Sequence, residues 1–182
     1  DTGKLYRAMA FLFKSKKIAG NYADEASRIF LEFDEALLES DLLLDESLGV
    51  LASEISKDSK VRVVLLDFQR DFINQNSKIV LDGRDTGSVI CPDADLKFFI
   101  DADVRVRAQR RTEQLQEKKS NLRLDYEEIL DSLMQRDFND KNRNISPLVI
   151  SEGAFVIDNS MMHLDILFKK IFELIDSFVH QA

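Results

Sequence analysis

The sequence predicts an α/β fold in which helices cover a parallel sheet. Three short apolar runs are typical of buried strands, and each one is followed directly by an aspartate. These runs are Ile79–Leu81, Leu96–Ile100 and Ala154–Ile157. Longer amphipathic stretches separate them along the chain. Strands that alternate with helices favour a parallel sheet, because parallel neighbours need a crossover connection that is usually a helix.

Apolar residues at helical spacing predict the helices. The expected ranges are Lys4–Lys17, Asp24–Glu39, Glu46–Ser56, Lys60–Asn74, Val104–Lys118, Tyr126–Lys141 and Leu164–Val179. The fourth of these has a clear apolar stripe on one face, made up of Val61, Val64, Leu65, Phe68 and Phe72. With two prolines and six glycines in 182 residues, no linker divides the chain. A single domain over residues 1–182 is therefore expected.

The composition argues against several classes of protein. A net charge of -8 is unlike that of a general nucleic-acid or membrane-surface binder. No apolar run approaches the roughly 20 residues that are needed to span a bilayer. The single cysteine, Cys91, cannot form an internal disulfide, which fits a reducing compartment and predicts a cytoplasmic location. The two histidines are isolated, so no bound structural metal is expected.

The most distinctive motif is Asp82-Gly83-Arg84-Asp85-Thr86-Gly87-Ser88, directly after the first predicted strand. Ligands of α/β proteins bind at the carboxyl ends of strands. An arginine there can hold a phosphate with its planar fork. The flanking aspartates can orient that fork or accept hydrogen bonds from a polar ligand. The motif therefore predicts an anion-binding site.

A second motif, Arg136-Asp137-x-x-Asp140-x-x-Arg143, falls on a predicted helix. Helical spacing places Arg136, Asp140 and Arg143 on one face. Taken alone, such a run favours a solvated face with intrahelical ion pairs.

Two further groups also combine arginines with the end of a regular element. They are Arg107-x-x-Arg110-Arg111 after the second predicted strand, and Asp1-Thr2-Gly3-x-x-Tyr6-Arg7 at the start of the chain. For the first, a solvated helix face is the simpler interpretation. For the second group, the simpler interpretation is an N-cap at Thr2 with Arg7 as a surface arginine. Together, however, the four groups supply several arginines in an acidic protein. Phosphoryl transfer needs such cations, because negative charge is dispersed over the transferred group.

In their combination and order these motifs resemble those of the cytidylate kinases, which are P-loop nucleoside monophosphate kinases. The resemblance runs from Asp1 to about the last predicted helix. Besides the four groups above, it is carried by Ala52-Ser53, Val61-Arg62, Gln69-Arg70, Pro92-Asp93-Ala94-x-x-Lys97 and Pro147-Leu148. It implies a parallel-sheet core with helices on both faces, an acceptor-binding lobe at about residues 18–58 and a helical lid at about residues 107–143.

The resemblance also implies an activity. Members of the family transfer the γ-phosphoryl group of ATP to CMP or dCMP with Mg²⁺, giving ADP and CDP or dCDP. The expected partners are therefore these nucleotides, without nucleic acid or membrane, and a monomer is expected.

The matching positions imply roles for single residues. Arg7, Arg84 and Arg136 resemble the clamp on the acceptor phosphate. Ser53, Arg62 and Asp85 resemble the residues that recognise cytosine; a carboxylate can accept from its amino group, and the other two can donate to its acceptors. Uracil has a carbonyl at that position, which disfavours UMP as acceptor. The remaining assignments are Asp140 and Arg143 beside the sugar, Tyr6 beside the acceptor, Asp82 as an orienting residue or one near the metal, and Arg107, Arg110 and Arg111 in the lid near the ATP phosphates. Arg84, Arg136, Arg110 and Arg111 are the expected catalytic residues.

Two features depart from the family pattern. The sequence contains no Gly-x-x-x-x-Gly-Lys-Ser/Thr, the loop that cradles ATP phosphates with backbone N–H groups and a lysine. The resemblance places that loop, with the first strand and first helix, upstream of Asp1, so a longer parent protein is expected. The alternatives are a catalytically inactive nucleotide-binding fragment and a kinase for another pyrimidine monophosphate such as UMP. The strand-rich insert common in the family is also reduced, because Ala23–Glu46 is short and acidic, with Leu42–Leu44 as its only strand-like run.

Overall fold

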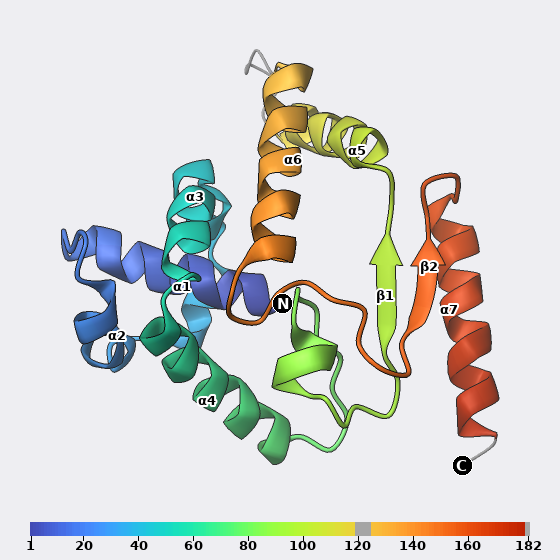
Figure 1. Cartoon of the computed structure of the whole chain (residues 1–182), viewed down its shortest axis with the longest axis horizontal. Helices are drawn as coiled ribbons and strands as arrows, with labels where there is room; N and C mark the ends of the chain where they lie inside the picture. Colours follow the sequence, from blue (N-terminus) through green and yellow to red (C-terminus); the bar gives the residue numbers. More distant parts are fainter. Residues whose placement is uncertain (119–124, 181–182) are drawn as a thin grey trace. The chain divides into compact units, whose positions relative to one another are not determined.

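The computed structural model describes residues 1–118 and 125–180. The chain forms two compact units (Figure 1). The first comprises Asp1–Pro92 and Asn142–Val149, and the second comprises Asp93–Lys141 and Ile150–Ala182. Helices predominate in both, and a small parallel sheet lies in the second. The predicted α/β class with a parallel sheet is confirmed at this level.

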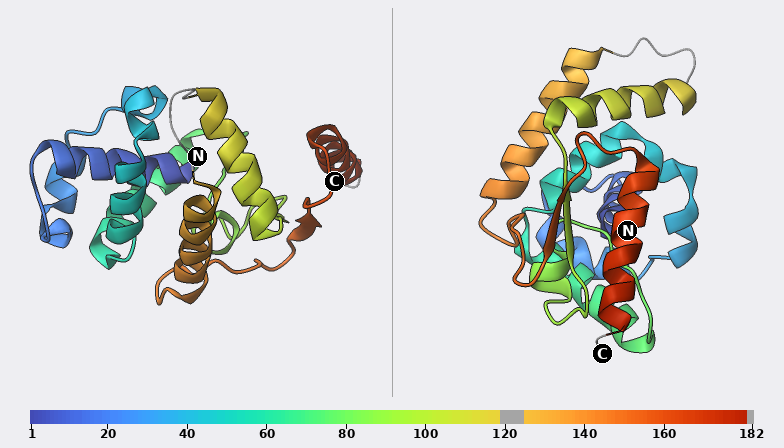
Figure 2. Two further views of the ribbon diagram at one scale, coloured as in Figure 1. Left: turned by 90° about the horizontal axis from the view of Figure 1, so that it is seen from above. Right: turned by 90° about the vertical axis from the view of Figure 1, so that its right-hand side faces the viewer.

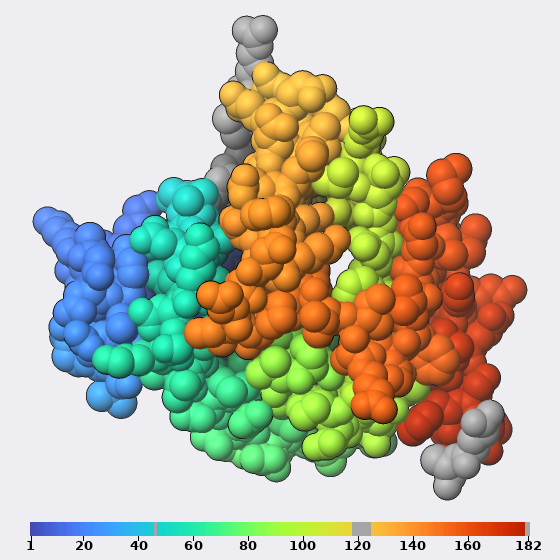
Figure 3. Space-filling model, viewed as in Figure 1, coloured from blue at the N-terminus to red at the C-terminus, as the bar shows by residue number. Residues whose placement is uncertain are grey.

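Among its described residues, the regular elements of the first unit are all helices or helical turns. Its elements are α1 (Thr2–Ser15), α2 (Tyr22–Phe30), η1 (Glu35–Glu39), η2 (Asp41–Leu44), α3 (Glu46–Ile55), α4 (Ser59–Gln75) and a π-helical turn, η3 (Thr86–Ile90). Helix α1 is central and packs against both α2 and α3 (Figure 2). In the space-filling view, these blue to green helices form a continuous packed surface (Figure 3).

Apolar residues one helical turn apart build the core of this unit. Met9 and Phe13 of α1 are fully buried, and so are Val61 and Leu65 of α4. This i, i+4 repeat directs both residues of each pair to one face. On α4, Val64 and Phe68 of the predicted stripe also pack against the core, whereas Phe72 is 44% exposed, so the predicted face is confirmed except at Phe72.

The helix predicted over Asp24–Glu39 is shorter in the structure, because α2 ends at Phe30. Asp34 lies in an extended conformation, and its side chain accepts a hydrogen bond from the backbone N–H of Ala36 at 2.9 Å. This local bond starts the separate turn η1 and competes with continued helix. The run Leu42–Leu44 is likewise part of the 3₁₀ turn η2 and not of a strand.

The second unit contains the sheet. Its elements are β1 (Phe98–Asp101), α5 (Val104–Lys118), α6 (Tyr126–Asn142), β2 (Phe155–Asp158) and α7 (Leu164–Val179). The last residue of α6 belongs to the first unit. Strands β1 and β2 are parallel, with Phe98 opposite Phe155 and Asp101 opposite Asp158. Two of the three predicted strands and all three helices of this unit are confirmed. Residues 119–124, the middle of the expected lid, lie outside the described residues.

The strand predicted over Ile79–Leu81 is wrong. The segment is irregular, and Val80 is 96% exposed. A strand is defined by hydrogen bonds to a neighbour, and the sheet of the described residues contains β1 and β2 alone. Apolar side chains are also exposed in the second unit, among them Val156 on β2 and Phe172 on α7.

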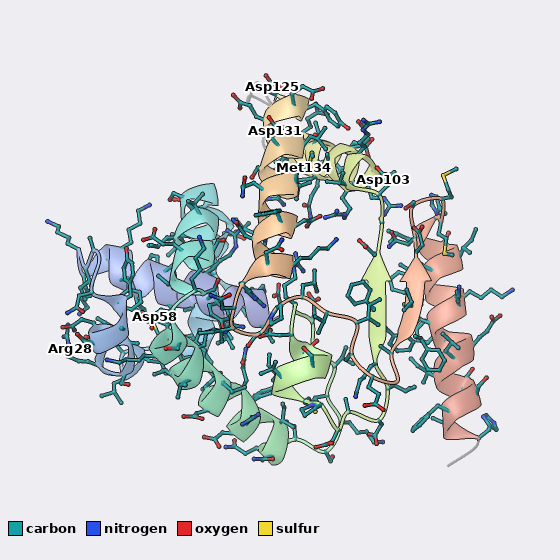
Figure 4. All side chains as sticks on the ribbon, viewed as in Figure 1. Arg28, Asp58, Asp103, Asp125, Asp131 and Met134 are labelled. Carbon is teal, nitrogen blue, oxygen red and sulfur yellow. The ribbon has the colours of Figure 1, made fainter. Side chains whose placement is uncertain are left out.

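Aspartates begin several of the helices, as Figure 4 shows for three that it labels. The side chain of Asp58 accepts hydrogen bonds from the N–H groups of Lys60 and Val61 at the start of α4. Asp103 and Asp125 have the same role at the starts of α5 and α6. Such caps satisfy N–H groups that have no partner inside the helix. In the described part of the chain, no helix is both long enough and apolar enough to cross a membrane.

Candidate functional site

A buried ion pair lies in the first unit. Arg62 of α4 and Asp85, which precedes η3, are 6% and 7% exposed. Arg62 donates from Nη2 to Oδ2 of Asp85, and from Nη1 to the carbonyl of Ser56 at 3.1 Å. The carbonyl of Asp85 accepts from the N–H groups of Val89 and Ile90, so the turn that follows fixes its backbone. Burying two charges is unfavourable unless they are paired and hydrogen-bonded, as they are here.

Arg143 approaches the same carboxylate from a distant part of the sequence. Its Nη2 lies 3.8 Å from Oδ2 of Asp85, and its side chain is 12% exposed. Its Nε donates to the carbonyl of Ser146 at 2.5 Å. Ser146 has φ 49°, a left-handed conformation that is uncommon for a residue other than glycine. The turn therefore holds Arg143 in place, and two guanidinium groups converge on one carboxylate.

Tyr6 of α1 completes this cluster, which consists of Tyr6, Arg62, Asp85 and Arg143. The Cζ of Arg62 lies 5.5 Å from the centre of the Tyr6 ring, within the range of a cation–π contact. Burial is the largest influence on the pKa of Tyr6 and raises it; Arg62 and Arg143 oppose the rise, and Asp85 adds to it. The phenol is thus kept neutral beside two cations.

The raised pKa of Tyr6 predicts a loss of stability in alkali. The pKa of tyrosine in an unfolded chain is about 10. Above that pH the unfolded state ionises first, so the free energy of unfolding should fall until the pH passes the folded pKa. Tyr6→Phe should remove this contribution. Denaturant unfolding of both proteins between pH 8 and about 11 checks it, and parallel pH profiles would contradict it.

The loop that carries Asp82 and Arg84 is fastened to the start of α1. Thr2 donates to the carbonyl of Asp82 from its N–H at 2.8 Å and from its Oγ1 at 2.9 Å. A Cβ at Gly83 would lie 2.0 Å from that Oγ1, so the close approach requires glycine. The predicted N-cap at Thr2 is wrong: Asp1 caps α1, accepting from the N–H groups of Gly3 and Lys4. Aspartate and threonine are both good N-caps, so the error was to choose the second of two adjacent candidates.

Two other predicted residues lie on or beside α3 in the same unit. Arg7 donates from Nη1 to the carbonyls of Leu43 and Asp45 at 2.9 and 3.0 Å. Ser53 is half-buried on α3, one residue after the buried Ala52. Arg84 is exposed, directly before Asp85.

The remaining predicted residues belong to the second unit. Arg107 of α5 binds Asp137 of α6 through two donors, Nη1 at 3.0 Å and Nη2 at 2.5 Å, and its Nε donates to the carbonyl of Ala102. The hydrogen bond that Arg107 donates to Asp137 is the largest cause of the raised pKa of Arg107. This pair joins α5 to α6. The sequence motif contained Asp137 but gave it no role, because the two residues are 30 positions apart.

The other arginines of this unit make more exposed contacts. Arg110 donates to Oδ1 and to the carbonyl of Asn159, both at 2.9 Å, and Arg111 donates to Gln114 at 2.7 Å. On α6, Nε of Arg136 lies 4.0 Å from Oδ2 of Asp140; the side chain of Arg136 is 49% exposed and that of Asp140 is 11% exposed. That contact is the intrahelical ion pair expected for the motif.

In the first unit, the structure brings together Tyr6, Arg62, Asp85 and Arg143. The resemblance had assigned Arg143 to the sugar, and the structure places its Nη2 3.8 Å from Oδ2 of Asp85, the residue assigned to the base. Among the described residues, no three histidine, cysteine, aspartate or glutamate side chains gather in a way that could hold a metal ion.

Comparison with known proteins agrees with the resemblance. The family model for cytidylate kinase matches residues 1–177. The cytidylate kinase of Bartonella quintana (strain Toulouse) is 38% identical over 179 residues, which are 98% of this chain and 82% of that protein. The cytidylate kinase of Nitrobacter winogradskyi is 40% identical over 180 residues, covering 97% of this chain and 82% of that protein. The cytidylate kinase of Bradyrhizobium diazoefficiens is 40% identical over 167 residues, covering 91% of this chain and 77% of that protein. The chain therefore belongs to the cytidylate kinase family.

Proposed function

We propose that the protein transfers a phosphoryl group from ATP to CMP or dCMP, giving ADP and CDP or dCDP. The observation that carries the proposal is the buried cluster around Asp85, in a chain that belongs to this family. A carboxylate between two arginines is an acceptor held in a fixed place, which suits a ligand with an amino group beside hydrogen-bond acceptors.

Recognition of cytosine follows from the geometry of Asp85. Both arginines meet its Oδ2, and we assign Oδ1 to the exocyclic amino group of cytosine. Arg62 and Ser53 donate to the ring nitrogen and carbonyl of the base. Uracil would direct a carbonyl oxygen at the carboxylate, leaving both acceptors without a proton between them. A buried polar mismatch of this kind is costly, and it makes CMP the preferred pyrimidine acceptor.

Arginines would also supply the phosphate contacts. We assign Arg7, Arg84 and Arg136 to the acceptor phosphate and the lid arginines Arg110 and Arg111 to the ATP phosphates. Of these, Arg84, Arg136, Arg110 and Arg111 stabilise the charge of the transferred group and act as catalytic residues.

Arg107 has a different place within the proposed lid. Its two hydrogen bonds to Asp137 are charge-assisted and part-buried, and exchanging them for a phosphate is less favourable than for Arg110. The contacts of Arg110 are exposed and go to neutral oxygens. We therefore propose that Arg107 holds α5 to α6 while Arg110 turns to ATP.

The donor side of the proposal involves groups beyond these residues. Mg²⁺ would be held largely by the nucleotide phosphates and water. Closure of the lid, at about residues 107–143, would exclude water and suppress hydrolysis of ATP. The family core implied for the chain has helices on both faces of its sheet and a P-loop. The 182 residues contain no Gly-x-x-x-x-Gly-Lys-Ser/Thr, so activity is best measured on the full-length gene product.

A phosphoryl-transfer assay tests this function. The full-length product is incubated with ATP, Mg²⁺ and either CMP, dCMP, UMP or AMP, and the diphosphates formed are measured. CMP and dCMP should be turned over faster than UMP and AMP. Binding of CMP without turnover would instead indicate an inactive nucleotide-binding protein, and faster turnover of UMP a kinase for another pyrimidine.

The proposed sugar contact of Asp140 gives a finer prediction. Asp140 is 8% exposed on α6, and its carboxylate would accept from a ribose hydroxyl. Asp140→Ala should lower kcat/KM more for CMP than for dCMP, by about tenfold, since one charge-assisted hydrogen bond is lost with CMP. Asp131→Ala, which removes an exposed carboxylate from the same helix, is the control. Equal losses for both substrates would argue against a contact with the 2′-hydroxyl.

A further inference from the structure

The guanidinium group of Arg7 lies directly against the backbone of Gly49. A Cβ built on Gly49 would be 2.6 Å from Nη2, 3.1 Å from Cζ and 3.4 Å from Nη1 of Arg7. The same guanidinium donates from Nη1 to the carbonyls of Leu43 and Asp45. The guanidinium of Arg7 is therefore held by two backbone carbonyls, one in η2 and one in the residue before α3, and it packs against Gly49.

Glycine is an unfavourable residue at this position of the chain. Gly49 lies inside α3, and glycine lowers the stability of a helix interior relative to alanine. Its φ is not positive, unlike that of Gly20 and Gly153, so the backbone conformation does not require glycine. What the position requires is space, and the group that occupies this space is the guanidinium of Arg7.

The geometry points to Gly49 as a positioning residue for the acceptor phosphate, acting through Arg7. This inference rests on the function proposed above, in which Arg7 belongs to the phosphate clamp. The two carbonyls take the donors of Nη1 and fix the plane of the fork. Gly49 lets the fork lie close to α3, so that Nε and Nη2 are presented to a phosphate in a set direction. Preorganised donors bind an anion more tightly than donors that must first be reoriented.

A simpler interpretation makes the contact purely structural, with Arg7 tying α1 to η2 and α3. The two interpretations differ in what an added methyl group should do. The atom nearest to the new Cβ is the end of a flexible side chain, so the helix can keep its place while the guanidinium moves. A structural tie predicts lower stability with unchanged ligand binding. A positioning role predicts weaker phosphate binding in a protein that is as stable as the wild type or more so.

The variant Gly49→Ala separates these outcomes in the full-length protein. We expect its midpoint of urea unfolding to equal or exceed that of the wild type. The dissociation constant for CMP, measured by calorimetry, should rise about tenfold, the loss of one charge-assisted contact. Binding of cytidine, which has no phosphate, should be unchanged, and so should the KM for ATP. Val50→Ala, at a 72% exposed position of the same helix, is the matched control and should bind CMP normally.

A double-mutant cycle assigns the effect to Arg7. In an Arg7→Ala background, Gly49→Ala should weaken CMP binding no further, because the displaced group is already gone. Unchanged CMP affinity in Gly49→Ala would overturn the inference while the proposed function stands. Equal losses for CMP and cytidine would also overturn it, since they would indicate a general distortion. A wild type that binds neither CMP nor dCMP would instead remove the proposed function itself, together with the inference.

Discussion

Asp85→Ala should lower the free energy of unfolding by about 3–5 kcal/mol, a large change for a single substitution. The substitution leaves Arg62 buried, at 6% exposure, without the carboxylate that compensates its charge. Arg143 loses its ion pair with Asp85 at the same time. Urea unfolding at neutral pH measures the effect, provided that the dependence on denaturant is the same in both proteins.

Two further variants make this test specific. Asp67→Ala removes an exposed carboxylate from α4 and should change stability by less than about 0.5 kcal/mol. The double variant Arg62→Met with Asp85→Leu replaces the pair by apolar side chains and should recover much of the lost stability, yet it should not bind CMP. A loss below about 1 kcal/mol in Asp85→Ala would mean that the pair is accessible to water and contributes no more than a surface ion pair.

Arg136→Ala should lower kcat/KM for CMP by about 10²–10³, the largest effect expected on activity. In the proposed function, the guanidinium holds the acceptor phosphate and stabilises charge on the transferred group. Its removal leaves that charge to the remaining arginines. Arg136→Lys should recover only part of the loss, because an ammonium group lacks the planar fork that can bind two oxygens. Steady-state kinetics with saturating ATP and varied CMP measure both variants.

Lys141→Ala is the matched control for Arg136→Ala. It removes one positive charge from an exposed position of the same helix and tests whether net charge alone steers the nucleotide. The assignment of Arg136 would be contradicted if its loss reduced kcat/KM no more than the loss of Lys141.

The sequence predicted those elements whose signal is local. The bounds of α5 and α7 agree with the predicted ranges, and α3 and α4 agree within one residue at most ends, since a repeat of 3.6 residues is visible in the chain itself. The strand over Ile79–Leu81 was not predictable in this way. An apolar run becomes a strand only when another segment pairs with it, and the residues of the run do not determine whether such a partner is present.

The site was predictable in part for the same reason. The motifs and the family resemblance named Arg62, Asp85 and Arg143 as single residues. Both arginines approach the same oxygen, Oδ2 of Asp85. These three positions are far apart in the sequence, so their contact depends on tertiary structure. The pairing of Arg107 with Asp137 was missed because a charge run on a helix usually faces solvent, and only the packing of α5 beside α6 selects the partner.

The selectivity of the full-length protein for CMP over UMP tests the central claim most directly, namely that Asp85 recognises cytosine. The measured quantity is the ratio of kcat/KM for the two acceptors, in the wild type and in Asp85→Asn. The wild type should favour CMP by at least about a hundredfold. The asparagine amide can donate to the uracil carbonyl, so the ratio should fall by about tenfold or more in the variant. An unchanged ratio in Asp85→Asn, or a wild type that uses UMP as well as CMP, would contradict the claim.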